Sequence, residues 1–130
     1  MRVVFDSNIF VSALAIPGGR ASEAINRIIA GSDVLILSPQ LVDEVLSVLA
    51  SKFGHDREAL SRTAVFLSDI SITVKPAGRI SVLADDPDNR VLECAAAADA
   101  DCIVTGDKMM LQMKEFAGIR IISLKDYLER

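Results

Sequence analysis

Short runs of hydrophobic residues, separated by longer stretches of mixed polarity, recur along the whole chain. Runs this short and this apolar are typical of strands buried in a sheet. The run at residues 70 to 74 differs because apolar and polar residues alternate, as in a strand with one exposed face. The pattern therefore predicts strands at residues 2–6, 34–37, 70–74, 103–105 and 119–122.

The stretches between these runs carry apolar residues at helical spacing. In the clearest, Leu41, Val45 and Leu49 recur every four residues, Ser38-Pro39 is a typical helix start, and Gly54 ends the pattern. We expect further helices over residues 8–14, 22–30, from 56 onward, 91–98, 108–113 and 124–128. Ser22 and Ser123 are the predicted N-caps of two of them.

Strands that alternate with helices favour right-handed β-α-β units and a mostly parallel sheet. No hairpin signal stands out. We therefore expect an α/β fold in three layers, α/β/α, built as one domain over residues 1–130. The methionines at 109, 110 and 113 are interpreted as core filling.

Composition narrows the class of protein. Hydrophobic residues make up 51% of the chain and charged residues 25%, which is ordinary for a globular protein and argues against disorder. Apolar stretches are interrupted before the roughly 18 residues that a membrane span needs, and residues 1–5 lack the layout of a signal peptide. We expect a cytoplasmic protein with no membrane association, in which Cys94 and Cys102 are reduced core residues.

Four acidic residues stand where predicted strands end or helices begin. Asp6 closes the first strand, Asp107 follows the strand ending at Thr105, Asp88 precedes a helix, and Glu44 interrupts an apolar helical stripe. The carboxyl edge of a parallel sheet is where sites form in open α/β folds. A set of carboxylates there suits a hard cation, Mg²⁺ or Mn²⁺, better than zinc.

Each acid also has a structural explanation, because helix capping and the helix dipole favour carboxylates at helix starts. Asp85 and Asp86 compete with Asp88 for the third position, and Asp85 is the second choice. Ser7, Asn8 and Thr105 are polar neighbours that support the first and fourth acids. Lys108 is a candidate phosphate contact, although an exposed lysine needs no such role.

Other chemistries find little support in the chain. His55 is the only histidine, so no Ser-His-Asp triad is available. Neither GxxxxGK[ST] nor GxGxxG occurs. The net charge of −4 argues against a polyanionic partner such as nucleic acid. If the four candidate metal ligands are set aside, however, the chain has 14 acidic and 14 basic residues. Bound cations would therefore leave the protein nearly neutral.

Taken together, these segments resemble the PIN-domain ribonucleases over nearly the full length. The resemblance rests on VVFDSNIFVSA at residues 3–13, Ser38-Pro39 before Glu44, DDPDN at 85–89 and IVTGDK at 103–108. It is nearest to the VapC-like toxins of bacterial and archaeal type II toxin–antitoxin pairs. It implies a PIN-like fold with Asp6, Glu44, Asp88 and Asp107 as the four acids.

The activity implied by the resemblance is Mg²⁺- or Mn²⁺-dependent endoribonuclease hydrolysis, which leaves a 5′-phosphate, with a small antitoxin protein and a second copy of the chain as partners. Two other interpretations stay open. The chain could be a non-catalytic PIN-like module that binds RNA or protein. It could also be an aspartyl-phosphate phosphohydrolase, but such enzymes would have a second aspartate where Asn8 stands.

Overall fold

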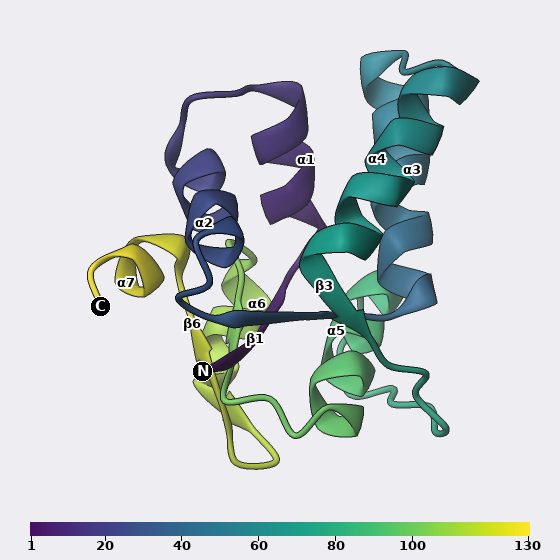
Figure 1. Cartoon of the computed structure of the whole chain (residues 1–130). Helices are drawn as coiled ribbons and strands as arrows, with labels where there is room; N and C mark the ends of the chain where they lie inside the picture. Colours follow the sequence, from purple (N-terminus) through teal and green to yellow (C-terminus); the bar gives the residue numbers. More distant parts are fainter.

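A computed structural model describes residues 1–130, and its centre is a six-stranded sheet in the order β3-β2-β1-β4-β6-β5 (Figure 1). Every neighbouring pair is parallel except β5 and β6. The strands are β1 (Arg2–Phe5), β2 (Val34–Leu37), β3 (Ser71–Thr73), β4 (Cys102–Val104), β5 (Glu115–Phe116) and β6 (Ile119–Ile122). The predicted α/β fold with a mostly parallel sheet is confirmed.

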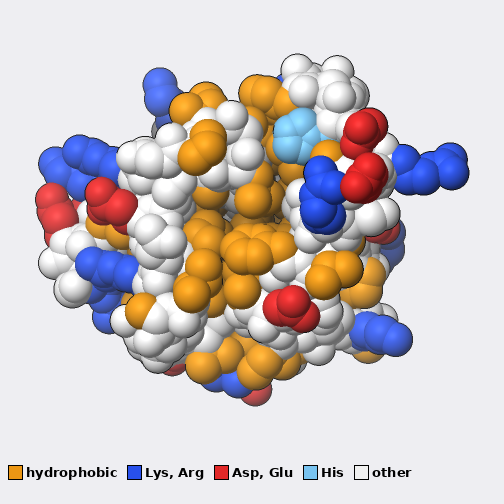
Figure 2. Space-filling model, turned by 45° about the horizontal axis from the view of Figure 1, so that its top comes forward, with side chains coloured by type: hydrophobic (Ala, Val, Ile, Leu, Met, Phe, Trp, Pro, Cys, Tyr) orange, Lys and Arg blue, Asp and Glu red, His pale blue; other side chains and the backbone are white.

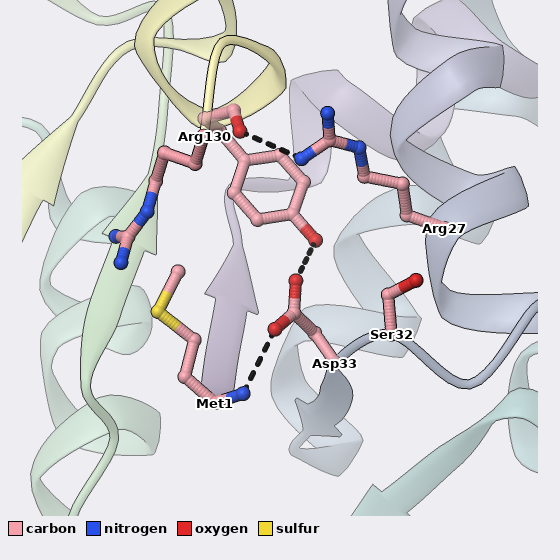
Figure 3. A pocket seen from close by; sticks show the side chains of 6 residues that line it. Met1, Arg27, Ser32, Asp33 and Arg130 are labelled. Atoms are coloured by element: carbon pink, nitrogen blue, oxygen red, sulfur yellow. Dashed lines mark hydrogen bonds and ion pairs between the residues drawn. The ribbon is translucent and has the colours of Figure 1, made fainter.

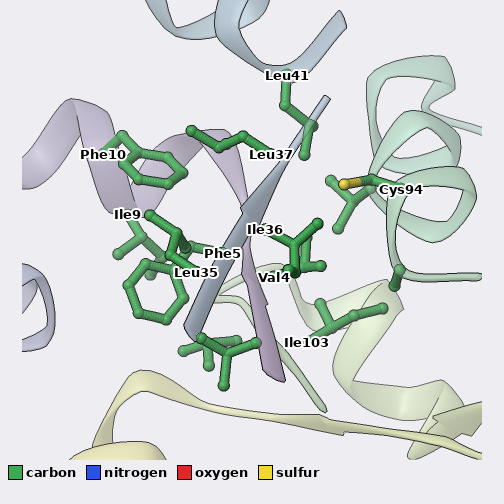
Figure 4. Packing of buried hydrophobic residues seen from close by; sticks show 14 of the residues in the cluster. Val4, Phe5, Ile9, Phe10, Leu35, Ile36, Leu37, Leu41, Cys94 and Ile103 are labelled. Carbon is green, nitrogen blue, oxygen red and sulfur yellow. The ribbon is translucent and has the colours of Figure 1, made fainter. Parts of the chain in front are cut away.

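Seven helices accompany the sheet: α1 (Ser7–Ala15), α2 (Arg20–Ile29), α3 (Pro39–Phe53), α4 (Arg57–Ile70), α5 (Asp86–Ala97), α6 (Lys108–Met113) and α7 (Leu124–Leu128). Helix α1 packs against α2 and α3, and α3 packs against α4. Helix α5 contacts β1, β2 and β4. Figure 4 shows α1 and α5 on opposite sides of β1 and β2, which gives the three predicted layers.

The core follows from the two-residue alternation of the central strands. Phe5 and Leu35 point toward α1, where the Phe5 ring lies 5.8 Å from that of Phe10, while Val4 and Ile36 point toward α5 (Figure 4). All of these side chains are at most 1% exposed. Both faces of the sheet are thus covered, which is why these strands are apolar throughout.

Several helix starts match the predicted caps. The Ser38 hydroxyl accepts from the Leu41 N–H, with Pro39 at the first helical position, and Ser123 caps α7. Gly54 ends α3 with a φ of 66°, a left-handed conformation that glycine adopts without strain.

The prediction that Ser22 is an N-cap was wrong, because α2 begins at Arg20 and Gly19 is its cap. The Ser22 hydroxyl instead accepts from the Gly18 N–H at 3.1 Å. The placement of Asp88 ahead of its helix was also wrong, since α5 begins at Asp86 and Asp88 lies in its first turn.

Strands β5 and β6 form a hairpin that was not predicted from the sequence. Its two-residue connection, Ala117-Gly118, has positive φ at both positions, as a type I′ turn requires. Ala is an unusual residue there, so the sequence carries no Asn-Gly or Asp-Gly signal. Of the three methionines interpreted as core filling, only Met110 is buried, and Met109 is 61% exposed. No helix combines the length and hydropathy that a membrane crossing requires.

Candidate metal centre

Asp6 lies at the carboxyl end of β1, where its backbone N–H continues the ladder to the Val104 carbonyl of β4 at 2.9 Å. Its side chain is 3% exposed and also caps α1. The Oδ1 atom accepts from the Asn8 N–H at 3.4 Å and from the Ser7 hydroxyl at 3.3 Å. These hydrogen bonds fix the Asp6 carboxylate at the carboxyl ends of β1 and β4.

Thr105 joins Asp6 to Asp107 through one buried hydroxyl. Its Oγ1 donates to Asp6 Oδ2 at 2.7 Å and accepts from the Asp107 N–H at 3.0 Å. Asp107 in turn caps α6 by accepting from the Met110 N–H at 2.9 Å. The two strand-end acids are therefore held together by a residue whose side chain has no exposed surface.

Asp88 reaches the same place from the first turn of α5. It is 7% exposed, and its carboxylate accepts no hydrogen bond in the structure. Burial, followed by the negative charges of neighbouring acids, raises the pKa of Asp88 to about 7. The acids that act on it are, in falling order, Asp107, Asp6, Asp85 and Glu44. The fold therefore gathers all four sequence-predicted acids within electrostatic range of one another.

Glu44 comes from α3 and is half-buried. It makes no hydrogen bond or ion pair, and it borders a small cavity together with Asp86 and Arg90. The two rivals of Asp88 lie further out. Asp85 is the exposed N-cap of α5, and exposed Asp86 pairs with Arg90 at 3.3 Å and with Arg79 at 3.7 Å.

The polar residues next to these acids also differ in exposure. Ser7 and Thr105 are buried against Asp6, whereas Asn8 contributes its backbone N–H and is exposed. Lys108 is exposed at the start of α6 and makes no ion pair, so its ammonium group is free beside Asp107.

The donor set fits a hard divalent cation. No three His, Cys, Asp or Glu side chains converge closely enough to hold one ion as they stand, and ionised carboxylates repel one another when no cation lies between them. Oxygen is nevertheless the only donor in the cluster, as Mg²⁺ and Mn²⁺ prefer. Burial raises the pKa of Cys94 to about 12 and that of Cys102 to about 11, so both remain thiols in the core.

A set of side-chain contacts on α5, not predicted from the sequence, holds the preceding loop. The Asn89 amide group donates to the Leu83 carbonyl and accepts from the Leu83 N–H, both at 2.9 Å. Glu93 accepts from the Ile80 N–H at 2.7 Å and pairs with Arg90 at 2.9 Å. The signal was available, because Arg90 and Glu93 are charged residues three apart in a helix of small apolar residues.

A larger cavity of about 550 Å³ lies at the opposite, amino-terminal edge of the sheet (Figure 3). There Asp33 accepts from the Met1 ammonium group at 2.8 Å and from the Tyr127 hydroxyl at 2.6 Å. Arg27 donates to carbonyls of α7 and lies over the Tyr127 ring. These contacts tie the chain end and α7 to β2, and they lie away from the acidic cluster.

The chain is similar in sequence to a known domain family and to an archaeal protein. The family model described as the PIN domain matches residues 2–109. An uncharacterised protein of Methanocaldococcus jannaschii is 27% identical over 119 residues, which cover 88% of this chain and 76% of that protein.

Two solved structures share the fold. A chain of VapBC2 from Rickettsia felis, crystallised with a DNA fragment from its promoter, is 15% identical, with a TM-score of 0.67 and coverage of 95% of this chain and 98% of that one. VapC20 of Mycobacterium tuberculosis, a toxin that cleaves the sarcin–ricin loop, is 14% identical, with a TM-score of 0.64 and coverage of 91% and 98%. At these identities the likeness is one of fold.

Proposed function

The chain belongs to the PIN-domain family, and from this membership together with its acidic cluster we propose that residues 1–130 form one metal-dependent endoribonuclease domain. The observation that supports this most is that Asp6, Asp88 and Asp107 lie within electrostatic range of one another at one edge of the sheet. A structural role does not require it, because capping needs each acid only at its own helix.

In this proposal Asp6, Glu44, Asp88 and Asp107 hold one or two Mg²⁺ or Mn²⁺ ions. A bound divalent ion supplies positive charge for the phosphodiester and lowers the pKa of water. Thr105 keeps Asp6 and Asp107 at a fixed separation, and Ser7 and Asn8 orient Asp6 from the other side. Asp85 is a reserve ligand at the rim.

The substrate is RNA, and the reaction is hydrolysis of a phosphodiester bond that leaves a 5′-phosphate. The acids position a water molecule in line with the scissile bond, and Lys108 contributes an unpaired ammonium group at the start of α6 for a flanking phosphate. A polyanion approaches this face only after cations have offset the carboxylates.

The test compares cleavage of a mixed RNA pool by the isolated protein in Mn²⁺ and in EDTA. Asp6→Asn is expected to abolish the cleavage that needs Mn²⁺. Asp69→Asn is the matched control, because Asp69 is an exposed carboxylate at the end of α4, next to the amino-terminal end of β3. Circular dichroism confirms that both variants fold. Full activity of Asp6→Asn would refute the assignment.

Two rival functions have their own outcomes in the same experiments. Binding of Mn²⁺ that depends on Asp6, without cleavage of any RNA, would favour a non-catalytic RNA- or protein-binding module. A trapped phosphoryl-enzyme would favour an aspartyl-phosphate phosphohydrolase. The second rival is disfavoured because Asn8, at the position of the missing second aspartate, is exposed and contributes only backbone to the site.

We also propose that the protein is the toxin of a toxin–antitoxin pair and is a homodimer. Support for an antitoxin partner comes from the likeness to a chain of VapBC2 and from the surface in Figure 2, where hydrophobic side chains line a hollow beside the only histidine. A cavity of about 320 Å³ between α1 and α4 lies there, lined by Leu14, His55, Ala59, Arg62, Thr63 and Phe66.

The partner is tested by co-purification with any small protein encoded beside this one. Ala59→Glu places a charge in the cavity and should release the partner, whereas Ser61→Glu, on an exposed position of the same helix, should not. Sedimentation of the isolated chain measures the dimer. Retention of the partner by both variants would place its binding site elsewhere.

A further inference from the structure

A small cavity of about 130 Å³ opens beside the acidic cluster, between the first turns of α3 and α5. Its lining residues are Gln40, Leu41, Glu44, Asp86, Pro87 and Arg90. Glu44 belongs to both the cavity and the cluster. A molecule held in the cavity is therefore a direct neighbour of whatever the acids bind.

The lining combines apolar walls with hydrogen-bonding groups of both kinds. Leu41 and Pro87 supply apolar surface. The Gln40 amide both donates and accepts, Asp86 accepts, and Arg90 donates. Nucleobases are recognised by this combination, because their faces pack on apolar groups and their edges are read by amide, carboxylate and guanidinium groups.

Charge and size select among possible occupants. The only cation in the lining is Arg90, which is already paired with Asp86 and Glu93, so no free positive charge faces the cavity to bind a phosphate. The cavity therefore suits a neutral group. Its volume corresponds to about four water molecules at roughly 30 Å³ each. That is room for one heterocyclic ring system and too little for a whole nucleotide.

The Arg90 wall of the cavity is held in place before any ligand arrives. Arg90 is only 12% exposed, and its Nη2 donates to Glu93 at 2.9 Å and to the Ile80 carbonyl at 3.0 Å. Its Nη1 bonds Asp86 at 3.3 Å. Because three partners already fix the guanidinium group, it can donate to a ligand with little further loss of conformational entropy, which favours binding.

We propose that this cavity is a nucleobase subsite that selects the base of a nucleotide next to the scissile phosphate, with Gln40 as its principal reader. The assignment rests on the proposed RNA cleavage, since that places a phosphodiester at the neighbouring acids. It gives the cut site a base preference at one position.

Binding is tested without catalysis by titrating the protein with adenosine, guanosine, cytidine and uridine. These nucleosides are uncharged, so phosphate contacts do not contribute. The side-chain amide signals of Gln40 and Gln112 are followed by NMR. Gln112 is exposed on α6 and is the internal control, being the only other glutamine. We expect saturable shifts at Gln40 that differ between the four bases, and none at Gln112.

The cut-site distribution on a random RNA pool is then compared between the wild type, Gln40→Ala and Gln112→Ala. The preference at one flanking position should fall about fivefold or more in Gln40→Ala, the lower end of what a good bidentate base contact contributes. It should persist in Gln112→Ala. Because the readout is a ratio between sites, a general loss of rate does not affect it.

The outcomes separate this assignment from the nuclease assignment. Cleavage with an unaltered base preference in Gln40→Ala, or Gln40 signals that no nucleoside shifts, overturns the subsite and leaves the nuclease in place. Nucleoside-dependent shifts at Gln40 in a protein that cleaves no RNA support a base-binding cavity, but they count against the nuclease and overturn the place of the cavity beside a scissile phosphate.

Discussion

Replacing Asp88 by asparagine should stabilise the metal-free protein at pH 8, although it removes a candidate ligand. Asp88 is 7% exposed, accepts no hydrogen bond and faces the negative charges of Asp107 and Asp6. Its ionised form is therefore disfavoured in the folded state, and asparagine keeps the shape without the charge. A residue that costs stability in this way is expected at a site whose partner is a cation.

The magnitude follows from the pKa of Asp88, which is raised from the ordinary 3.8 to about 7. The folded state then binds a proton more tightly than the unfolded state, so stability falls as pH rises from about 4 and the loss is complete above about 7. Each pKa unit corresponds to about 1.4 kcal/mol. Solvent at the mouth of the site screens part of this, which leaves about 1–2 kcal/mol.

The assay is urea denaturation of the wild type and Asp88→Asn at pH 8, without metal and with Mn²⁺. Without metal the variant should be the more stable by that amount, or about 3–8 °C in melting temperature. With Mn²⁺ the order should reverse, because a ligand bound only to the folded state adds about 2.7 kcal/mol at 100 times its dissociation constant.

Asp69→Asn is the control for the loss of one negative charge, since Asp69 is exposed and lies away from the cluster. It should show neither the gain without metal nor the reversal with it. If Asp88→Asn were less stable than the wild type at pH 8 without metal, Asp88 would be stabilised by its surroundings, and the electrostatic reasoning would be wrong.

Three further substitutions test two hydrogen-bonding side chains and one backbone conformation. Thr105→Val keeps the volume but removes the hydroxyl that bonds both Asp6 and the Asp107 N–H; urea denaturation should show a loss of about 2 kcal/mol, and calorimetry should show weaker Mn²⁺ binding. Tyr127→Phe removes the 2.6 Å hydrogen bond to Asp33 and should cost about 1–2 kcal/mol; an unchanged melting temperature would show that this bond adds no net stability. Gly54→Ala forces a side chain into the left-handed conformation at φ 66° and should cost about 1 kcal/mol. Gly78→Ala is the control and should cost nothing, because Gly78 has no left-handed φ and an added Cβ there meets no neighbour.

Much of the fold was predictable because its signals are local. The apolar runs gave the positions of β1, β2, β4 and β6 to within one residue. Ser38-Pro39 and Gly54 marked both ends of α3 through capping and left-handed geometry. The predictions failed where the local signal was weak or shared, as in the Ala117-Gly118 turn and the competing N-caps of α2.

The candidate site was only partly predictable. Asp6 and Asp107 could be paired in advance because both follow strands, and parallel strands end at one edge. Asp85, Asp86 and Asp88 lie near one helix start, and the sequence ranked Asp88 first only by placing it ahead of a helix that in fact begins at Asp86. Their different exposure separates them: Asp88 is buried toward the other acids, whereas Asp85 and Asp86 are exposed.

The sequence by itself determined the type and order of the elements and the residues that could carry chemistry, because these depend on periodicity, capping and side-chain type over a few neighbouring positions. Only the tertiary structure decided which acids share an environment. Thr105 bonds Asp6 across 99 positions of the chain, and Glu44 meets Asp88 only because α3 and α5 begin beside each other. Strand order and helix packing set such distances, and no local pattern encodes them.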